Sequence, residues 1–138
     1  MAGALRIAVA GASGRMGQML IEAVLGADDC ALAGAFDRTG SPALGHDAAA
    51  FLGRGSGVVV TDDVRAALDG ADVMIDFTRP EGTLAHLTLC RELGVKAVVG
   101  TTGFTDEQKA LVAAHAREVA VVMAPNMSVG VNVVLRLL

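Results

Sequence analysis

A short apolar segment followed at once by three glycines constrains the fold of this chain more than any other feature. Residues 7–10 read I-A-V-A, which suits a strand buried on both faces of a sheet. The glycines that follow, Gly11, Gly14 and Gly17, are spaced G-x-x-G-x-x-G. In such a turn one glycine makes the bend, one lets backbone N–H groups approach a pyrophosphate, and one lets the next helix pack closely on the strand. The spacing has one residue more than the commonest dinucleotide fingerprint, so a dinucleotide site needs support from the rest of the chain.

Further apolar segments predict five more strands that alternate with helices. The strands are expected over residues 31–36, 57–61, 72–77, 95–100 and 119–124. The helices are expected over residues 15–25, 62–68, 80–93 and 105–118, with a loop over 38–57 that holds at most a short helix around 47–52. Six strands in this alternation predict an α/β fold of the Rossmann type, a doubly wound parallel sheet with right-handed crossovers in a single domain.

Local signals predict which faces the helices bury and where they begin. Four side chains recur at helical spacing after the glycine turn and are expected to face the sheet: Met16, Met19, Leu20 and Ala23. Thr61 or Asp62 is expected to cap the helix over 62–68, and Pro80 to open the next helix, which stops at Gly94. The segment 105–108 matches the T-x-x-Q capping box of the last helix.

The composition argues against several classes of protein. A chain of 138 residues holds one domain, and 53% apolar residues argue against disorder. A net charge of −4 with only four Phe gives no basic or aromatic surface for nucleic acid. No segment approaches the roughly 18 apolar residues of a membrane-spanning helix, and Arg6 interrupts the N-terminal apolar run, which therefore predicts a first strand and not a signal peptide. We expect a cytoplasmic protein in which Cys30 and Cys90 are reduced thiols in or near the core.

An acidic residue at the end of the second predicted strand supports the dinucleotide hypothesis. Asp37 lies 20 residues beyond Gly17, the distance at which a carboxylate accepts hydrogen bonds from the adenosine ribose. Arg38 beside it could meet a 2′-phosphate, which the carboxylate would repel, so both NADH and NADPH are expected as cofactors. The alternative is that Asp37 is a solvated turn residue with Arg38 as its neighbour.

The chain offers no set of residues that would catalyse a reaction or hold a metal ion. The histidines, His46, His86 and His115, share no metal-site or triad spacing with one another or with a carboxylate, so each is expected on the surface or on a helix face. Asp76 interrupts an apolar strand and is expected either to be hydrogen-bonded in the sheet or to face the cofactor cleft. With no nucleophile and no Lys at a strand end, the sequence predicts a cofactor site without a proton donor.

Four motifs in the same order make the chain resemble the dihydrodipicolinate reductase family. They are V-A-G-A-S-G-R-M-G at residues 9–17, D-F-T-R-P-E-G-T at 76–83, V-V-G-T-T-G-F at 98–104 and A-P-N-M-S-V-G-V-N at 124–132. The resemblance covers the whole chain. It implies an NAD(P)H-dependent oxidoreductase, also named 4-hydroxy-tetrahydrodipicolinate reductase, that transfers hydride to a cyclic imine or enamine dicarboxylate in diaminopimelate and lysine biosynthesis.

The resemblance also implies a role for each strand end. Asp37 would bind the adenosine ribose and Arg38 the 2′-phosphate, although the family often has Glu where Asp37 stands. The segment expected to wrap the pyrophosphate comprises Gly11, Ala12, Ser13, Gly14, Arg15 and Met16. Phe77 and Arg79 would border the adenine side. The residues expected at the nicotinamide end are Gly100, Thr101 and Thr102, of which Thr102 could also touch substrate, and those expected to close over it are Ala124, Pro125, Asn126 and Met127.

The resemblance further implies that the catalytic groups belong to a second half of the enzyme. Residues 1–127 would form the dinucleotide-binding domain, and 128–138, an apolar stretch without a stop signal, the hinge and the start of a substrate and tetramerisation domain. That domain would carry a His-His pair, a Lys and a Ser-Gly-Thr anion site. We therefore expect a homotetramer for the full-length enzyme but not for this chain, and cofactor binding here without useful catalysis.

Two alternatives stay open at this point. One is a nucleotide domain like that of aspartate or homoserine dehydrogenase, which shares the sheet but not the G-T-T-G-F motif. The other is a non-catalytic module that binds NAD(P) and senses redox state. The residues encoded after Leu138 would separate the three hypotheses.

Overall fold

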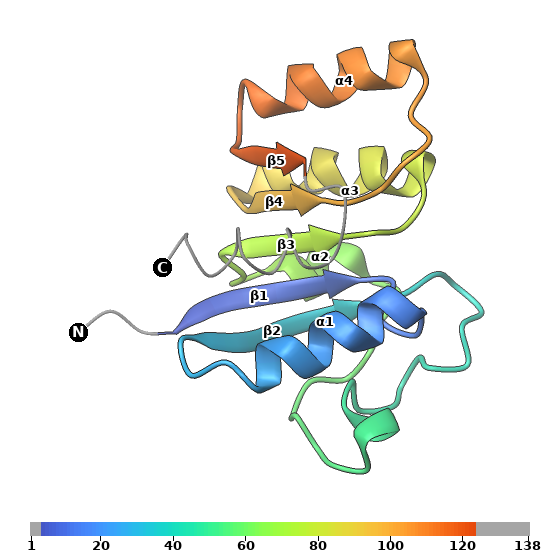
Figure 1. Cartoon of the computed structure of the whole chain (residues 1–138), viewed down its shortest axis with the longest axis vertical. Helices are drawn as coiled ribbons and strands as arrows, with labels where there is room; N and C mark the ends of the chain where they lie inside the picture. The colour runs from blue at the N-terminus through green and yellow to red at the C-terminus, as the bar shows by residue number, and fades with distance from the viewer. Residues whose placement is uncertain (1–3, 124–138) are drawn as a thin grey trace.

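The computed structural model describes residues 4–123, which form a parallel sheet with helices on both faces (Figure 1). Its strands are β1 (Leu5–Ala10), β2 (Cys30–Phe36), β3 (Val73–Asp76), β4 (Lys96–Val99) and β5 (Val121–Met123). They are arranged in the order β2-β1-β3-β4-β5, with every neighbouring pair parallel. The chain thus moves outward from β1 to β2 and then returns to the other side of β1 at β3. The predicted Rossmann-type doubly wound sheet is confirmed, and its strand order reverses between β1 and β3.

The sheet separates the apolar core into two layers, and helices cover each layer. They are α1 (Arg15–Leu25), α2 (Val64–Leu68), α3 (Pro80–Leu93) and α4 (Asp106–Ala116), with a short 3₁₀ turn, η1, at Ala50–Leu52. Ile7 and Val9 of β1 pack with α1, whereas Ala8 and Ala10 of the same strand pack with α2, α3 and α4. In Figure 1, α1 lies in front of the sheet, and α2 and α3 lie behind it. The first strand is therefore buried on both faces, as its unbroken apolar sequence predicts.

The face that α1 buries differs from the predicted one. Its buried residues are Gly17, Leu20, Ile21 and Val24. Met19 is 44% exposed, so its expected place in the core is wrong. A Cβ at Gly17 would overlap the Gly11 carbonyl, which shows how closely the first turn of α1 packs on the strand exit. This close approach sets the rotation of the helix, because the side of Gly17 must face the sheet.

The segment 57–61 is not a strand of the sheet, so the prediction of six strands is wrong for the described residues. It forms only two isolated bridges, a parallel one between Phe36 and Thr61 and an antiparallel one between Asp47 and Val59. The Asp47 carboxylate accepts hydrogen bonds from the backbone N–H groups of Ala49, Ser56 and Gly57. These bonds tie the start of the segment to its own loop and away from β2.

The helix ends follow local signals in most places. α3 begins at Pro80 and ends before Gly94, which has φ +70°, and α4 carries the predicted capping box between Thr105 and Gln108. α4 ends at Ala116, two residues before the predicted end. α2 is capped by Asp63, whose side chain accepts from the Ala66 N–H at 3.1 Å, and not by Thr61 or Asp62. Thr61 accepts a hydrogen bond from the Asp63 N–H at 3.0 Å, which holds the approach to the helix.

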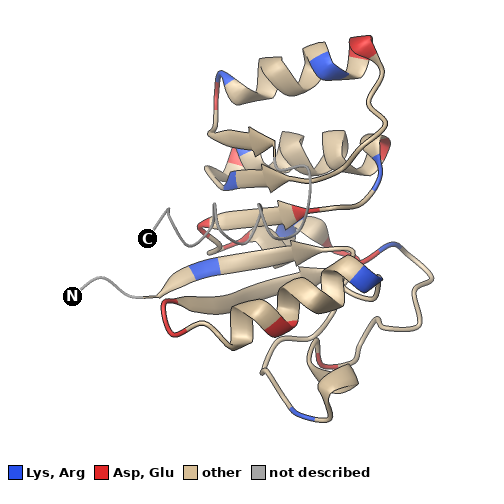
Figure 2. Ribbon diagram, in the orientation of Figure 1, with Lys and Arg blue, Asp and Glu red and all other residues tan. Residues whose placement is uncertain are grey.

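The cysteines and the charged residues are distributed as in an ordinary α/β domain. Cys90 is buried, Cys30 is partly buried, and both are free thiols, as predicted. Lys and Arg are scattered over strands, helices and loops (Figure 2). Within residues 4–123 no helix is long and apolar enough to cross a membrane.

Candidate dinucleotide site

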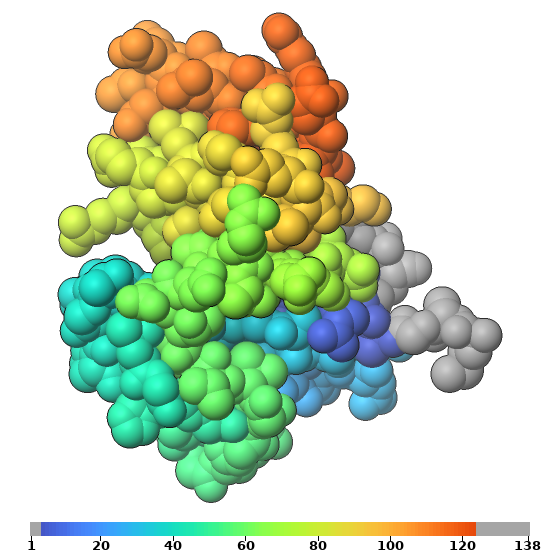
Figure 3. Space-filling model, turned by 180° about the vertical axis from the view of Figure 1, so that it is seen from behind, coloured from blue at the N-terminus to red at the C-terminus, as the bar shows by residue number. Residues whose placement is uncertain are grey.

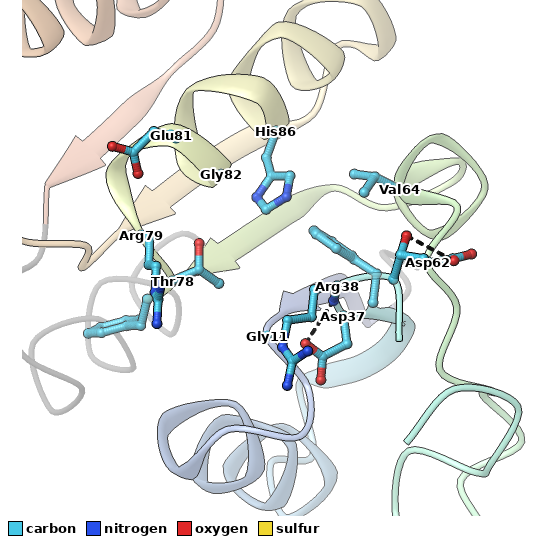
Figure 4. A pocket seen from close by; sticks show the side chains of 13 residues that line it. Gly11, Asp37, Arg38, Asp62, Val64, Thr78, Arg79, Glu81, Gly82 and His86 are labelled. Carbon is cyan, nitrogen blue, oxygen red and sulfur yellow. Dashed lines mark hydrogen bonds between the residues drawn. The ribbon is translucent and has the colours of Figure 1, made fainter. Parts of the chain in front are cut away.

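A pocket of about 590 Å³ opens at the carboxyl edge of the sheet, where the strand order reverses. Seen from behind, the surface shows a notch at this edge, between cyan atoms from the segment after β2 and yellow-green atoms from the start of α3 (Figure 3). Four segments line it (Figure 4): Gly11 after β1; Phe36, Asp37, Arg38 and Thr39 at the end of β2; Asp62 and Val64 at the start of α2; and Phe77, Thr78, Arg79, Glu81, Gly82 and His86 after β3. Open parallel sheets bind ligands at such a reversal.

The glycine turn beside this pocket has the bend and the close packing that the sequence predicts. Gly11 has φ +69°, which makes the bend, and a Cβ there would approach the Thr78 Cγ2 to 2.9 Å. Gly14 precedes α1 in extended conformation and is exposed, with no side chain capping the helix. The first turn of α1 contains no acidic residue. The free N–H groups and the positive end of the helix dipole therefore form an uncovered anion site.

Asp37 is fixed against the glycine turn. Its Oδ2 accepts from the Ser13 N–H at 3.0 Å, from the Ser13 hydroxyl and from the Ser41 hydroxyl at 3.1 Å, and its Oδ1 accepts from the Arg38 N–H at 2.9 Å. Partial burial alone would raise the pKa of this carboxyl, but the hydrogen bonds outweigh it and lower the pKa below the usual value. Asp37 is thus an ionised acceptor in the pocket wall, and two of its donors are hydroxyl groups that ligand hydroxyls can replace.

The wall next to Asp37 carries charges of both signs. The Arg38 side chain is exposed and, among the described residues, forms no salt bridge. Asp62 lines the same pocket near the start of α2 and accepts a hydrogen bond from the Thr39 hydroxyl at 3.2 Å (Figure 4). A cation able to meet a phosphate therefore lies beside two carboxylates that would repel one.

Asp76 and His86 form a pair that reasoning from the sequence missed. Asp76 ends β3 and is fully buried, and its Oδ2 lies 2.6 Å from the His86 Nδ1 on α3. Its Oδ1 accepts from the Thr78 N–H at 2.8 Å and the Thr78 hydroxyl at 2.6 Å. His86 lies on a helix face, as expected, but the spacing of the histidines gave no sign of its carboxylate partner. Asp76 is hydrogen-bonded at the carboxyl end of its strand, one of the two roles expected for it. A carboxylate in an apolar strand requires donors, and that requirement was the signal available in the sequence.

The pair is held tightly on all sides. Burial alone would raise the pKa of Asp76, but the hydrogen bond and the charge of His86, together with the Thr78 donors, lower it. The Phe36 ring meets the His86 ring edge-on, with 4.9 Å between centroids. The His86 side chain is 15% exposed, and its ring projects from α3 into the pocket (Figure 4). The imidazole therefore has a fixed position in the pocket wall.

The residues expected at the nicotinamide end lie at the next strand end along the same edge. Thr101 is buried, and its hydroxyl lies 2.7 Å from the Thr83 hydroxyl of α3. A Cβ at Gly100 would overlap the Phe77 ring, so the two segments lie in close contact. Thr101 and Thr102 line a separate cavity of about 350 Å³ together with Lys109 of α4, a cation near a strand end that the sequence reasoning also missed.

The structure thus brings together part of the predicted set. Five of its members line the main pocket: Gly11, Asp37, Arg38, Phe77 and Arg79. Ser13, Gly14 and Arg15 are exposed in the turn and first helical position beside it, Ala12 is buried there, and Met16 is half-buried. The predicted closing segment, Ala124 to Met127, lies outside the described residues, as do the hinge and tail over 128–138.

Comparison with known proteins agrees with this geometry. A parallel sheet with a glycine turn at its reversal and a carboxylate on the next strand defines a dinucleotide-binding domain of the Rossmann type. The family model described as "Dihydrodipicolinate reductase, N-terminus" matches residues 5–127. The chain belongs to the dihydrodipicolinate reductase family and corresponds to its N-terminal nucleotide-binding domain. The resemblance found in the four sequence motifs is confirmed.

Curated relatives share well over half of the residues. The 4-hydroxy-tetrahydrodipicolinate reductase of Burkholderia multivorans is 63% identical over 134 residues, which are 97% of this chain and 51% of that protein. The enzyme of the same name from Ralstonia nicotianae is 60% identical over the same shares. The chain spans about half the length of the curated relatives it matches.

Solved structures show the same fold. The dipicolinate-bound dihydrodipicolinate reductase from Paenisporosarcina sp. TG-14 has a TM-score of 0.70 and 28% identity, over 89% of this chain and 48% of that one. A homoserine dehydrogenase from S. aureus has a TM-score of 0.64 at 18% identity, over 88% of this chain and 32% of that one. This second likeness shows the fold alone, so homoserine dehydrogenase shares the sheet, as the first alternative expects, while the family is that of the reductase.

Proposed function

We propose that this chain binds NADH or NADPH along the carboxyl edge of its sheet, as the cofactor half of a 4-hydroxy-tetrahydrodipicolinate reductase. The observation that carries the proposal is the open helix N-terminus after the glycine turn, with the ionised Asp37 held directly beside it. An anion site with a hydroxyl acceptor beside it matches a pyrophosphate joined to a ribose. The relatives whose printed name is that of the reductase support the same assignment.

The residues present fit such a cofactor. The N–H groups in the first turn of α1, which begins at Arg15, have no partner within the helix and would face the pyrophosphate. A side chain at Gly11 would collide with the Thr78 Cγ2, so the bend requires glycine. Asp37 would exchange the Ser13 and Ser41 hydroxyls for those of the adenosine ribose. The base would enter the pocket that Arg79 and His86 line. When bound, the nicotinamide supplies a hydride, and the protein fixes its distance and orientation.

We propose that both cofactors bind. Arg38 gives a 2′-phosphate one cation to pair with, while Asp37 and Asp62 in the same wall oppose its charge. A bidentate pair between a guanidinium and a phosphate contributes more than the repulsion by the two carboxylates, which water and salt screen, subtracts. NADPH is therefore tolerated and NADH is not excluded.

The substrate and its proton would come from the part of the enzyme beyond this domain. The solved relative from Paenisporosarcina has dipicolinate, a cyclic dicarboxylate, bound. Among residues 4–123, the side chains at the second cavity include one cation, Lys109, and the hydroxyls of Thr101 and Thr102, but no carboxyl or imidazole. We therefore propose that this chain alone binds cofactor without useful turnover, and that assembly into a tetramer uses the other half.

Calorimetric titration of the purified chain with NADH and with NADPH tests the proposal. We expect one site for each, with dissociation constants within about tenfold of each other. The same preparation, given the cyclic substrate, should leave the NADH absorbance unchanged. Absence of binding by both cofactors contradicts the site assignment, and turnover at the rate of an intact enzyme contradicts the proposal that catalysis needs groups from the other half of the enzyme.

A further inference from the structure

The second nitrogen of His86 is open to the pocket. The only hydrogen bond of this ring to a described residue is the one from Nδ1 to Asp76. Within the described part of the chain, no buried side-chain nitrogen or oxygen lacks a hydrogen-bond partner. Nε2, which has no such partner among the described residues, is therefore accessible from outside the core. It belongs to a side chain that lines the pocket between Thr78 and the end of β2 (Figure 4). This nitrogen can act on whatever occupies the pocket.

The partners of Asp76 decide what Nε2 can do. An ionised carboxylate only accepts hydrogen bonds, so in the neutral imidazole the proton must be on Nδ1. The Nε2 lone pair is then a fixed acceptor. The ring cannot rotate away easily, because Phe36 packs against it and Asp76 is itself held by the Thr78 N–H and hydroxyl. The buried carboxylate thus sets the hydrogen-bonding character of the pocket wall without touching the ligand.

We propose that Asp76 is a positioning residue that makes His86 a selective acceptor for the exocyclic amine of adenine. This inference rests on the proposed function, which puts the adenosine end of the cofactor in this pocket. A 6-amino purine presents a donor to the Nε2 lone pair, whereas a 6-oxo purine presents an acceptor at the same position. The site therefore discriminates the base by a lone pair whose location a buried side chain dictates.

Asp76→Asn should reverse this character. The Thr78 N–H is a backbone donor and cannot become an acceptor, so the asparagine must keep its oxygen there. Its NH₂ group then points at the His86 Nδ1 and donates to it. Nδ1 loses its proton, Nε2 gains one, and the pocket presents a donor where it had an acceptor. A substitution of one atom at a buried position would thus exchange the preferred base.

The experiment compares reduced NADH with its 6-oxo analogue, reduced nicotinamide hypoxanthine dinucleotide, by calorimetry at pH 8.5. We expect the unchanged chain to bind NADH about tenfold more tightly, the order of one hydrogen bond. Asp76→Asn should bring the ratio of the two affinities, NADH over its 6-oxo analogue, to one or below. His86→Ala should bring the same ratio close to one. Asp72→Asn is the matched control, since Asp72 accepts the Arg6 N–H at 2.9 Å at the opposite end of β3 and should leave the ratio at about ten.

Long-range ¹H–¹⁵N spectra of the ligand-free chain test the tautomer itself. They should show the proton on Nδ1 of His86 in the unchanged chain and on Nε2 in Asp76→Asn. An imidazolium at the assay pH, or the proton on Nε2 in the unchanged chain, overturns the proposal. If Asp76→Asn does not fold, the unchanged chain and His86→Ala still decide it.

The two proposals fail in different ways. If neither NADH nor its analogue binds, the proposed function has failed, whatever the spectra show. If NADH binds and the spectra show the expected tautomer, but both bases bind equally, the function stands and recognition of adenine by His86 is wrong.

Discussion

The carboxylates at the ends of β2 and β3 lie at the same edge of the sheet but are satisfied in different ways. Asp37 is partly exposed, and two of its donors are the hydroxyls of Ser13 and Ser41. Asp76 is fully buried, and its donors are a backbone N–H, a neighbouring hydroxyl and a histidine ring. Hydroxyls on short side chains are exchangeable for those of a ligand, whereas a buried pair is not. The first carboxylate is available for binding, and the second organises the wall.

The same contrast applies to the backbone around them. The turn after β1 leaves the N–H groups of α1 uncovered and places Gly14 in solvent. The turn after β3 is bonded to the segment after β4, because the Gly100 N–H donates to the Asp76 carbonyl at 2.8 Å and the Thr83 hydroxyl pairs with that of Thr101. Substitutions at the end of β2 should therefore alter cofactor binding more than fold stability. Substitutions at the end of β3 should alter fold stability more than cofactor binding.

Removal of the buried carboxylate should have the largest effect. Asp76→Ala leaves the Thr78 N–H and the His86 Nδ1 without their partner, and we expect it to lower the free energy of unfolding by about 3–5 kcal/mol. Urea unfolding followed by circular dichroism measures the loss. Asp72→Ala, which removes an exposed carboxylate from the other end of β3, should cost about 1 kcal/mol or less. Equal losses of unfolding free energy in the two variants would mean that the hydrogen bonds of Asp76 stabilise the fold no more than those of an exposed carboxylate.

Blocking the glycine turn should abolish binding and spare the fold. Gly14 has φ −73°, and the nearest atom to a Cβ there is the Gly11 oxygen at 3.4 Å, so Gly14→Val is compatible with the fold. Its side chain would occupy the space of the pyrophosphate. We expect NADH affinity to fall by at least about 100-fold, near 2.7 kcal/mol, with unfolding changed by less than about 1 kcal/mol. Unchanged affinity in calorimetry would remove the anion site from this helix end.

Removal of the exposed carboxylate should have a moderate effect that depends on the cofactor. Asp37→Ala deletes the acceptor proposed for the ribose, so NADH should bind about tenfold more weakly. NADPH should lose less, because the same change removes a charge that repels its 2′-phosphate. Parallel titrations of the unchanged chain and the variant with both cofactors measure the two losses of affinity. Equal losses would indicate that Asp37 only holds Ser13 and Ser41 in the turn.

Low pH should reduce the stability that Asp76 gives to the fold, and we expect this effect to be the smallest of the four. The pKa of Asp76 is lower in the folded chain than its ordinary value of about 3.9, so its stabilising contribution is fully present above about pH 4. That contribution is lost as the pH falls below 4 through the lowered pKa. Urea midpoints between pH 6 and pH 2.5 should decline more steeply in the unchanged chain than in Asp76→Asn. Identical slopes would show that this group does not contribute to the acid response.

Much of this arrangement follows from signals only a few residues long. Pro80 and Gly94 bound α3, and Thr105 and Gln108 cap α4, because each acts on backbone groups within one helical turn. Asp37 was located as a pocket residue by its distance from the glycine turn. These features required no knowledge of what packs against them.

Other features were wrong or missed because they depend on contacts far apart in the sequence. The segment 57–61 has the composition of a strand but hydrogen-bonds mainly with the loop around His46, since Gly45 and Val60 are paired there. Met19 has the spacing of a core residue, yet the close fit of Gly17 against Gly11 rotates it outward. Asp76 and His86 are ten residues apart with no recurring motif, and only the packing of α3 behind β3 makes them a pair.

The sequence by itself determined the alternation of strands and helices, the glycine turn and the family, because these depend on local conformation and on short motifs. The tertiary structure decided which strand ends meet at the reversal, which face α1 buries and which nitrogen of His86 is open to the pocket. The physical reason is that a buried polar group must find partners in whatever segment the fold places beside it. For Asp76 those partners are Thr78 and His86, and they determine the hydrogen-bonding character of the wall beside the turn that starts at Gly11.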